Sequence, residues 1–255
     1  MLSESSKLDE INLEDEEFDL SNLPPPGFSG EEENPGPFMS FVFHTVTYLF
    51  PFLFVATVYF SLNNLMGMRL TWTIVPALVA SWFLADFITG LVHWACDTYG
   101  TVNTPIVGHS FIRNFRSHHR YPKDITISPL VYTVGPVALL SLLTLPVAIV
   151  LSLYYPQSFL IAFVSFIYAF ITFLTVLTNQ FHKWAHADST DKWVVFLQKH
   201  KLILNPDHHK LHHTAPFESN YCITHGGSNP FLEKIRFFRT VEFLLAKIGF
   251  KTSVY

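Results

Sequence analysis

Four long apolar stretches constrain the fold of this chain more than any other feature. They cover residues 41–62, 70–94, 130–154 and 159–181. Each is long enough to cross the hydrocarbon core of a bilayer, which takes a helix of about 20 apolar residues. The chain is also 49% hydrophobic and only 14% charged, which is unusual for a soluble domain. We therefore predict an all-α integral membrane protein with about four transmembrane helices.

The third stretch leaves two arrangements open. It contains Gly135, Pro136 and Pro146, and proline removes a hydrogen bond from the interior of a helix. The stretch is therefore predicted to be either a kinked span or a re-entrant segment.

The first 37 residues differ in composition from the rest of the chain. They hold eleven of the twenty acidic residues and two proline- and glycine-rich segments. Such a composition does not supply enough apolar surface for a packed core. We predict a disordered acidic tail over residues 1–37, followed by one membrane domain over residues 38–255.

Basic residues predict the orientation, because Lys and Arg favour the cytosolic side of short connections. The basic residues after the second stretch are Arg113, Arg116, Arg120 and Lys123, and several lysines follow the fourth stretch. Both regions and both termini are therefore predicted to be cytosolic. The amphipathic segments 192–204 and 229–250 are expected to lie on the membrane surface.

Histidines are concentrated in short motifs. Residues 208–213 read HHKLHH, and on a helix His209 shares a face with His212 and His213. Imidazole is a ligand for zinc, copper, nickel and iron, and the absence of cysteine from this segment argues against a thiolate site. The predicted metal ligands are His93, Asp97, His118, His119, His182, His186, His208, His209, His212 and His213. One ion takes three or four protein ligands, so this set predicts two ions and needs no further catalytic residue.

These motifs follow the predicted cytosolic ends of the spans, so they are expected to form a histidine-rich cap there. Two members remain open. Asp97 is either a ligand or a partner that holds a ligand imidazole, and His208 points away from the other three if residues 208–213 are helical. Asp86 lies inside the second span, where an acid indicates either function or a polar partner in the bundle. The remaining histidines are predicted to be interfacial polar residues: His44, His109, His200 and His225.

The four basic residues after the second stretch have two interpretations. They either contact a lipid phosphate or an acidic electron donor, or simply follow the positive-inside rule. Two other functional classes also stay open. A metal transporter or sensor would need a polar pathway through the bilayer, and a zinc-dependent membrane hydrolase would need fewer ligands.

Four motifs in order carry a resemblance to a known family. They are VHWACDTYG (92–100), TPIVG with FIRNFRSHH (104–119), NQFHKWAH (179–186) and HHKLHH with NYCITHG (208–226). They resemble the Kua or plasmanylethanolamine desaturase family, within the membrane histidine-box desaturases. Asp97 stands where an HxxxH box would place a second histidine, and Phe115 stands three residues before the His118-His119 pair.

The resemblance implies a lipid desaturase of the endoplasmic reticulum with two iron ions. It also implies O2 as co-substrate and electrons from reduced cytochrome b5 and its NAD(P)H reductase. The expected reaction forms the vinyl ether bond of plasmalogens, with an acyl-phospholipid desaturase or hydroxylase as the alternative. The partners implied are phospholipid and the electron donor, and no nucleic acid. The position of the histidines at helix ends predicts a shallow site, which favours the first carbons of a glycerolipid-linked chain.

Overall fold

The computed structural model describes residues 35–253, apart from the side chains of residues 109 and 110. Within this part of the chain all regular structure is helical. The predicted acidic tail lies almost entirely outside the described residues. Its last two residues belong to the first described helix, because that helix begins at Gly36.

Four helices are long and apolar enough to cross a membrane. They are α2 (Gly36–Gly67), α3 (Ile74–Thr98), α5 (Leu130–Tyr154) and α6 (Phe159–His186). The predicted number of spans is therefore confirmed, and α5 has the predicted bounds. The helix α5 continues through Pro136 and Pro146 without interruption, so the re-entrant alternative was wrong.

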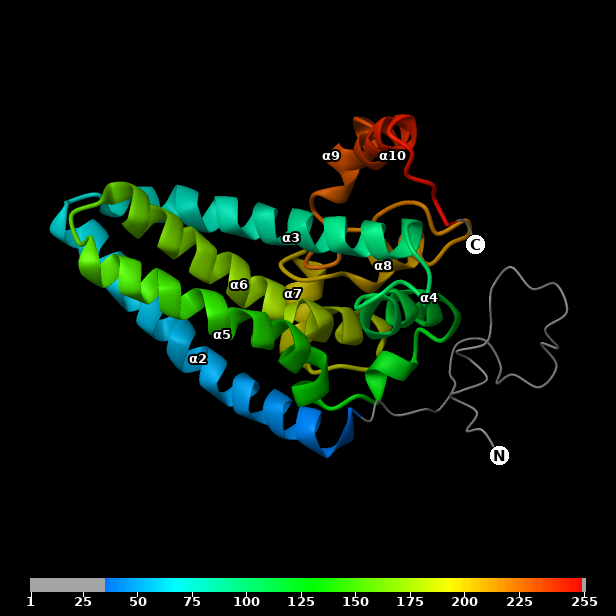
Figure 1. Cartoon of the computed structure of the whole chain (residues 1–255), viewed down its shortest axis with the longest axis horizontal. Helices are drawn as coiled ribbons and strands as arrows, with labels where there is room; N and C mark the ends of the chain where they lie inside the picture. The colour runs from blue at the N-terminus through cyan, green and yellow to red at the C-terminus, as the bar shows by residue number, and fades with distance from the viewer. Residues whose placement is uncertain (1–34, 254–255) are drawn as a thin grey trace, which may run out of the picture.

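Short connections join the spans at one end of the bundle, at the left of Figure 1. Between α2 and α3 the chain turns at Arg69, whose φ of 59° is left-handed, and passes through the short helix η2 (Thr71–Thr73). Between α5 and α6 lie only Tyr155 to Ser158, and the Ser158 hydroxyl accepts a hydrogen bond from the Ile161 amide. Connections this short require antiparallel neighbours.

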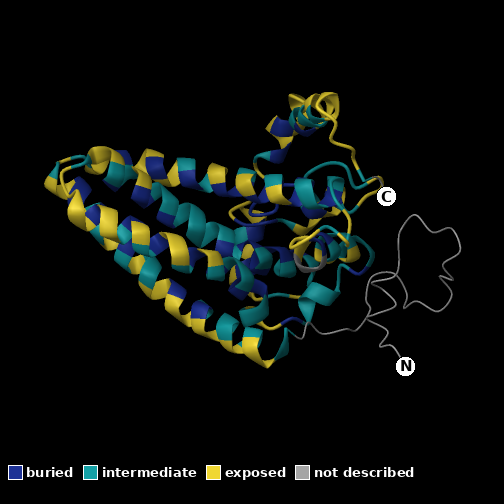
Figure 2. Ribbon diagram, in the orientation of Figure 1, coloured by how far each residue is buried: buried dark blue, intermediate teal, exposed yellow. Residues whose placement is uncertain are grey.

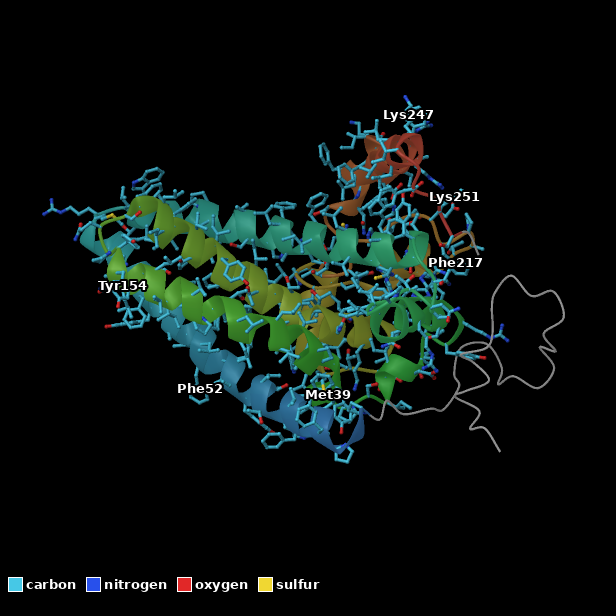
Figure 3. The ribbon with its side chains drawn as sticks, viewed as in Figure 1. Met39, Phe52, Tyr154, Phe217, Lys247 and Lys251 are labelled. Carbon is cyan, nitrogen blue, oxygen red and sulfur yellow. The ribbon has the colours of Figure 1, made fainter. Side chains whose placement is uncertain are left out.

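Small side chains allow the spans to approach each other closely. A Cβ atom added at Gly135 of α5 would lie 2.7 Å from the Cβ atom of Phe43 in α2. The α2–α5 core contains Val46, Phe50 and Ala138. The outer faces of the spans carry exposed apolar side chains, and Figure 2 shows the exposed residues along α2. Phe52 and Tyr154, labelled in Figure 3, are examples, with exposed fractions of 72% and 78%, as expected for a surface that contacts lipid.

The shorter helices gather at the opposite end of the bundle, where α3 and α6 end and α5 begins (Figure 1). They are a π-helical turn η3 (Gly108–Ile112), α4 (Arg113–Arg120), η4 (Asp124–Thr126), α7 (Lys192–Lys199), α8 (Pro206–His212), α9 (Asn229–Lys234) and α10 (Phe237–Lys247). We refer to this region as the polar end.

Both predicted surface helices are shorter than expected. In the 192–204 segment, α7 ends at Lys199 and a turn follows with Lys201 at φ 56°. The 229–250 segment is broken into α9 and α10 at Arg236, whose φ of 52° is left-handed. Such a conformation cannot continue a right-handed helix.

Candidate metal centre

Four elements supply the predicted ligands at the polar end. The last turns of α3 carry His93 and Asp97, and the last turns of α6 carry His182 and His186. The remaining ligands come from the short helix α4 and from α8 with the residue that follows it. Because α4 packs against α3 and α8 packs against α6, motifs far apart in the sequence meet in one place.

The first cluster, which we call the five-histidine group, consists of His118, His182, His186, His209 and His213. The Nε2 atoms of four of these converge. The Nε2 atom of His186 lies 3.0 Å from that of His118, 3.1 Å from that of His182 and 2.9 Å from that of His209. The Nε2 atoms of His182 and His209 lie 2.8 Å apart. Ligands about 2.1 Å from one ion stand about 3 Å apart when they meet at a right angle, so these spacings fit one shared ion.

The second cluster, which we call the aspartate group, consists of His93, Asp97, His119 and His212. The Asp97 Oδ2 atom lies 3.3 Å from the Nε2 atom of His93, 3.2 Å from that of His119 and 3.6 Å from that of His212. A carboxylate oxygen thus faces three imidazole nitrogens. This position fits Asp97 as a ligand, in the place of the missing second histidine of the HxxxH pattern.

Backbone carbonyls orient two histidines of the aspartate group. The Nδ1 atom of His93 lies 3.1 Å from the carbonyl oxygen of Tyr221, and that of His212 lies 2.8 Å from the carbonyl oxygen of Ser219. A carbonyl only accepts, so each Nδ1 carries the proton and donates it. Each Nε2 atom therefore presents a lone pair to the group, as metal-bound histidines commonly do.

Several buried polar atoms in these groups have no hydrogen-bond partner within the described residues. They are Nε2 of His93, His212 and His213, and Oδ1 of Asp97. Leaving a buried polar atom unpaired costs about 1–3 kcal/mol each. A concentration of such atoms at one point indicates that a metal ion is their partner.

The imidazoles of His118, His209, His212 and His213 are neutral at pH 7, as metal ligands must be. Burial, and secondarily neighbouring histidines, hold the pKa values of His118, His209 and His212 well below the usual 6.5. The same causes lower the pKa of His213 to about 2. These donors, nitrogen with one carboxylate and no thiolate, suit iron as well as zinc or copper.

His208 is the predicted ligand that the structure places outside both groups. Its Nε2 atom instead accepts a hydrogen bond of 2.9 Å from the Asn229 side-chain amide. On α8 it points away from His209, as helical geometry requires for an adjacent residue. We therefore leave His208 out of the proposed ligand set.

Three of the four basic residues predicted to contact a headgroup or an electron donor form hydrogen bonds within the chain. The Arg116 guanidinium donates to backbone carbonyls at the end of α3, of which the oxygen of Gly100 is closest at 2.9 Å. Lys123 donates to the carbonyl of His186 at 2.7 Å and forms an ion pair with Asp188. Arg120 donates to the Tyr121 hydroxyl at 2.8 Å. Arg116 and Lys123 thus stabilise the polar end, an outcome that the sequence interpretation missed.

Asp86 is fully buried in α3, and its carboxylate accepts hydrogen bonds from a loop after α8. His225, predicted to be interfacial, is instead buried in that loop and stacks on Trp82 with ring centroids 3.4 Å apart. In the sequence, the signal for the contact between Asp86 and the loop that contains His225 was the acid within an apolar span, since such an acid needs polar partners.

Comparison with known proteins places these features in a family. A family model described as lipid desaturase domain matches residues 82–252. The chain is 43% identical to plasmanylethanolamine desaturase of Myxococcus xanthus over 69% of this chain and 61% of that protein. It is 41% identical to plasmanylethanolamine desaturase 1 of Mus musculus, over 68% of this chain and 65% of that protein. It is also 34% identical to chloroplastic fatty acid desaturase 4-like 1 of Arabidopsis thaliana, over 67% and 56%.

The chain spans 56% to 65% of the length of these curated relatives, which is less than two thirds. No solved structure matches it. The matched residues include both ligand groups and the loop that orients the aspartate group. The chain therefore belongs to the lipid desaturase domain family.

Proposed function

We propose that this chain is a membrane lipid desaturase that binds two iron ions, one in each ligand group. The observation that carries the proposal is the convergence of buried imidazole nitrogens and one carboxylate into two adjacent groups at one end of a four-span bundle. The similarity to plasmanylethanolamine desaturases adds the substrate class: an alkyl ether phospholipid that becomes a vinyl ether.

The bound irons would supply the oxidising power needed to break unactivated C–H bonds with O2. In the overall reaction two adjacent carbons lose one hydrogen each, and O2 is reduced to two water molecules. The balance requires two further electrons and two protons. We propose reduced cytochrome b5, with its NAD(P)H reductase, as the electron source.

The protein's own residues would hold the ligands and exclude water. Aromatic rings surround the aspartate group. Between ring centroids, Phe115 lies 5.0 Å from His93, Tyr221 lies 5.5 Å from His212, and Phe217 lies 4.9 Å from His119. Burial of this kind strengthens the electrostatic interactions inside the site.

The depth of the site supports oxidation close to the glycerol linkage. The second span covers 28 residues, which is about 42 Å of helix, against about 30 Å of hydrocarbon. Asp97 and His186 lie in the last turn of α3 and at the last residue of α6, so the groups lie near the membrane surface. We propose the 1′,2′ bond of an ether phospholipid as the product, and a bond near the carbonyl of an acyl phospholipid as the second candidate.

The cellular setting is also part of the proposal. The basic connections favour a cytosolic polar end, and we propose the endoplasmic reticulum membrane as the location. Arg116 and Lys123 bind backbone carbonyls, so we leave these two residues out of the proposed contact with the headgroup phosphate.

The transporter alternative lacks support in the described spans. In these spans, Asp86 is the buried acid that lies outside the ligand groups, and both of its carboxylate oxygens accept hydrogen bonds from backbone amides. His44 lies on the exposed face of α2. Neither residue forms a polar path across the bilayer.

The test supplies defined alkyl-ether and acyl phospholipids to membranes that contain the protein, with O2 and an NADH-driven cytochrome b5 system. Mass spectrometry then locates any new double bond. We expect a 1′,2′ vinyl ether, and loss of product on anaerobic incubation. An acyl product near the carbonyl would support the second candidate. A product unsaturated only at mid-chain would overturn the shallow-site argument, and metal binding with no lipid oxidation would overturn the desaturase assignment.

A further inference from the structure

We infer that Asp86 is a positioning residue for the aspartate group. Its carboxylate holds residues 219–228, here called the carbonyl loop, in the place from which two backbone carbonyls orient His93 and His212. The inference rests on the proposed metal centre. It adds that one of the two ions depends on an acid that is not itself a ligand.

The Asp86 side chain is fully buried, and both of its carboxylate oxygens accept hydrogen bonds from backbone amides. The Oδ1 atom accepts hydrogen bonds from the backbone amides of Thr224, His225 and Gly226 at 3.1, 3.0 and 3.0 Å. The Oδ2 atom accepts one from the Ser228 amide at 3.0 Å. A buried carboxylate is costly unless hydrogen bonds satisfy it, and hydrogen bonds to a charged acceptor are the stronger kind. Four backbone amides in five residues therefore fix this part of the loop to α3.

His225 does not replace these amides as the partner of the charge. Its Nδ1 atom lies 3.5 Å from Asp86 Oδ2 but accepts a hydrogen bond of 2.9 Å from the Gly227 amide. Its Nε2 atom lies 3.2 Å from the carbonyl oxygen of Trp82 and donates to it. With one nitrogen donating and the other accepting, the ring is neutral. Burial, the largest cause, also lowers the pKa of His225.

The carbonyl loop is also attached to the spans beside Asp86. Gly90 leaves room for Cys222, because a Cβ atom at position 90 would lie 2.5 Å from the Cys222 sulfur. The Thr224 hydroxyl lies 2.9 Å from that of Thr89 in α3 and 2.8 Å from that of Thr178 in α6. The loop thus joins the two spans that carry four of the ligands.

A second clamp holds the loop from its far end. The Asn229 side chain accepts from the Cys222 amide and donates to the Cys222 carbonyl, both at 2.9 Å. Tyr221 directly precedes the clamped residue Cys222, and the Tyr221 carbonyl accepts the hydrogen bond from Nδ1 of His93. The position of that carbonyl therefore depends on Asp86 and Asn229, which both bind residues that follow Tyr221.

Only one ligand group has this support among the described residues. Carbonyl oxygens of the loop accept hydrogen bonds from the Nδ1 atoms of His93 and His212. Both histidines are members of the aspartate group. In the five-histidine group, by contrast, the Nδ1 atom of His209 is buried without a partner. A shift of the loop should therefore disturb one ion more than the other.

Asp86→Asn is the direct test, because it keeps the shape of the side chain. The amide has one acceptor oxygen, and its NH2 group must face a backbone amide that also donates. We expect the loop to shift and the affinity of the aspartate group for metal to fall about tenfold, the lower end of the effect seen for partners that orient metal ligands.

The probe is Co²⁺, titrated into metal-free protein in detergent and followed by its visible absorption. The wild type should bind in two steps. His119→Ala should remove the step of the aspartate group, and His213→Ala should weaken the step of the five-histidine group. Asp86→Asn should weaken the step that His119→Ala removes and leave the other within about twofold. No Co²⁺ binding by the wild type would contradict the proposed metal centre rather than the role of Asp86.

Asn64→Leu is the matched control. Asn64 is another buried polar residue within a span, and it donates to the Ser152 carbonyl at 2.8 Å, at the end of the bundle remote from the ligands. This variant should lose stability without changing either binding step. Equal weakening of both steps by Asp86→Asn, or no change in either, would overturn the inference.

A milder variant covers the case in which Asp86→Asn does not fold. Thr224→Val is close to isosteric and removes the hydroxyl that contacts Thr89 and Thr178. It should weaken the same step at least threefold. If Asp86→Asn yields no folded protein, an unchanged step in Thr224→Val overturns the inference.

Discussion

At the scale of single residues, the direction of each imidazole matters more than its presence. Adjacent histidines in the same motif have different environments: the Nε2 atom of His209 lies 2.9 Å from that of His186, whereas the Nε2 atom of His208 is bound to Asn229. A helix turns by about 100° per residue, so one of two neighbours on α8 faces the metal centre and the other faces the carbonyl loop.

This difference gives a matched pair of variants. We expect His209→Ala to lose the metal of the five-histidine group and to lower desaturase activity at least 100-fold. His208→Ala should keep both metals, with a loss of stability of about 1 kcal/mol from the broken hydrogen bond. Metal analysis and lipid turnover on both purified proteins check this. Equal metal loss in the two variants would contradict the proposed ligand set.

The buried histidines also predict how the metal-free protein responds to acid. Burial lowers the pKa values of His209 and His212 in the folded protein, while the unfolded chain binds protons near pH 6.5. The stability from these neutral side chains is present above pH 6.5 and decreases as the pH falls below it. Each such histidine contributes up to about 1.4 kcal/mol per pH unit. The unfolding temperature of metal-free protein should therefore drop between pH 7 and pH 5. A flat profile over that range would be inconsistent with buried neutral imidazoles.

At the scale of elements, the polar end depends on how α3 terminates. The Arg116 side chain of α4 donates to the carbonyl oxygens of Cys96 at 3.3 Å, Asp97 at 3.4 Å and Gly100 at 2.9 Å. Free carbonyls at a helix end carry partial negative charge, which a cation stabilises. The same contact brings α4, with its two histidines, against the end of α3, which carries His93 and Asp97.

Arg116→Gln should therefore destabilise the protein by about 1.5–3 kcal/mol, the range for hydrogen bonds to a charged group. Arg120→Gln, which loses its bond to the Tyr121 hydroxyl, is the control and should cost less. Thermal unfolding in detergent measures both. If Arg116→Gln were as stable as the wild type but failed to use phospholipid, the headgroup interpretation of Arg116 would be right instead.

At the scale of the whole molecule, four spans form the scaffold and all ligands lie at one end of it. Both ligand groups fall within residues 93–213, and α2, which carries none of these residues, packs mainly against α5 and α6. Residues 1–34 lie outside the described structure, and they precede the matched family region.

Deletion of residues 1–34 should therefore leave metal content and turnover within about twofold of the full chain. The shortened protein retains Gly36, where α2 begins. Metal analysis and lipid turnover on membranes with equal amounts of inserted protein test this prediction. A deletion that inserts normally and binds metal but does not turn over lipid would assign the acidic segment a role in catalysis.

The sequence alone determined the local features, because these depend on composition and spacing along the chain. Apolar length predicted four spans, since a helix must satisfy its backbone groups internally in lipid. Helical spacing predicted that His182 and His186, or His209 and His213, would share a face. The number of candidate ligands led to the prediction of two ions, since one ion takes three or four protein ligands.

Only the tertiary structure decided how these pieces combine. The division into a five-histidine group and an aspartate group depends on which helices pack together, and no spacing within a motif contains that information. The same holds for Arg116, whose partners lie 16 to 20 residues away, and for Asp86, whose partners lie about 140 residues away. A charged side chain takes the donors or acceptors that folding brings to it, so its role follows from long-range packing rather than from its neighbours in the sequence.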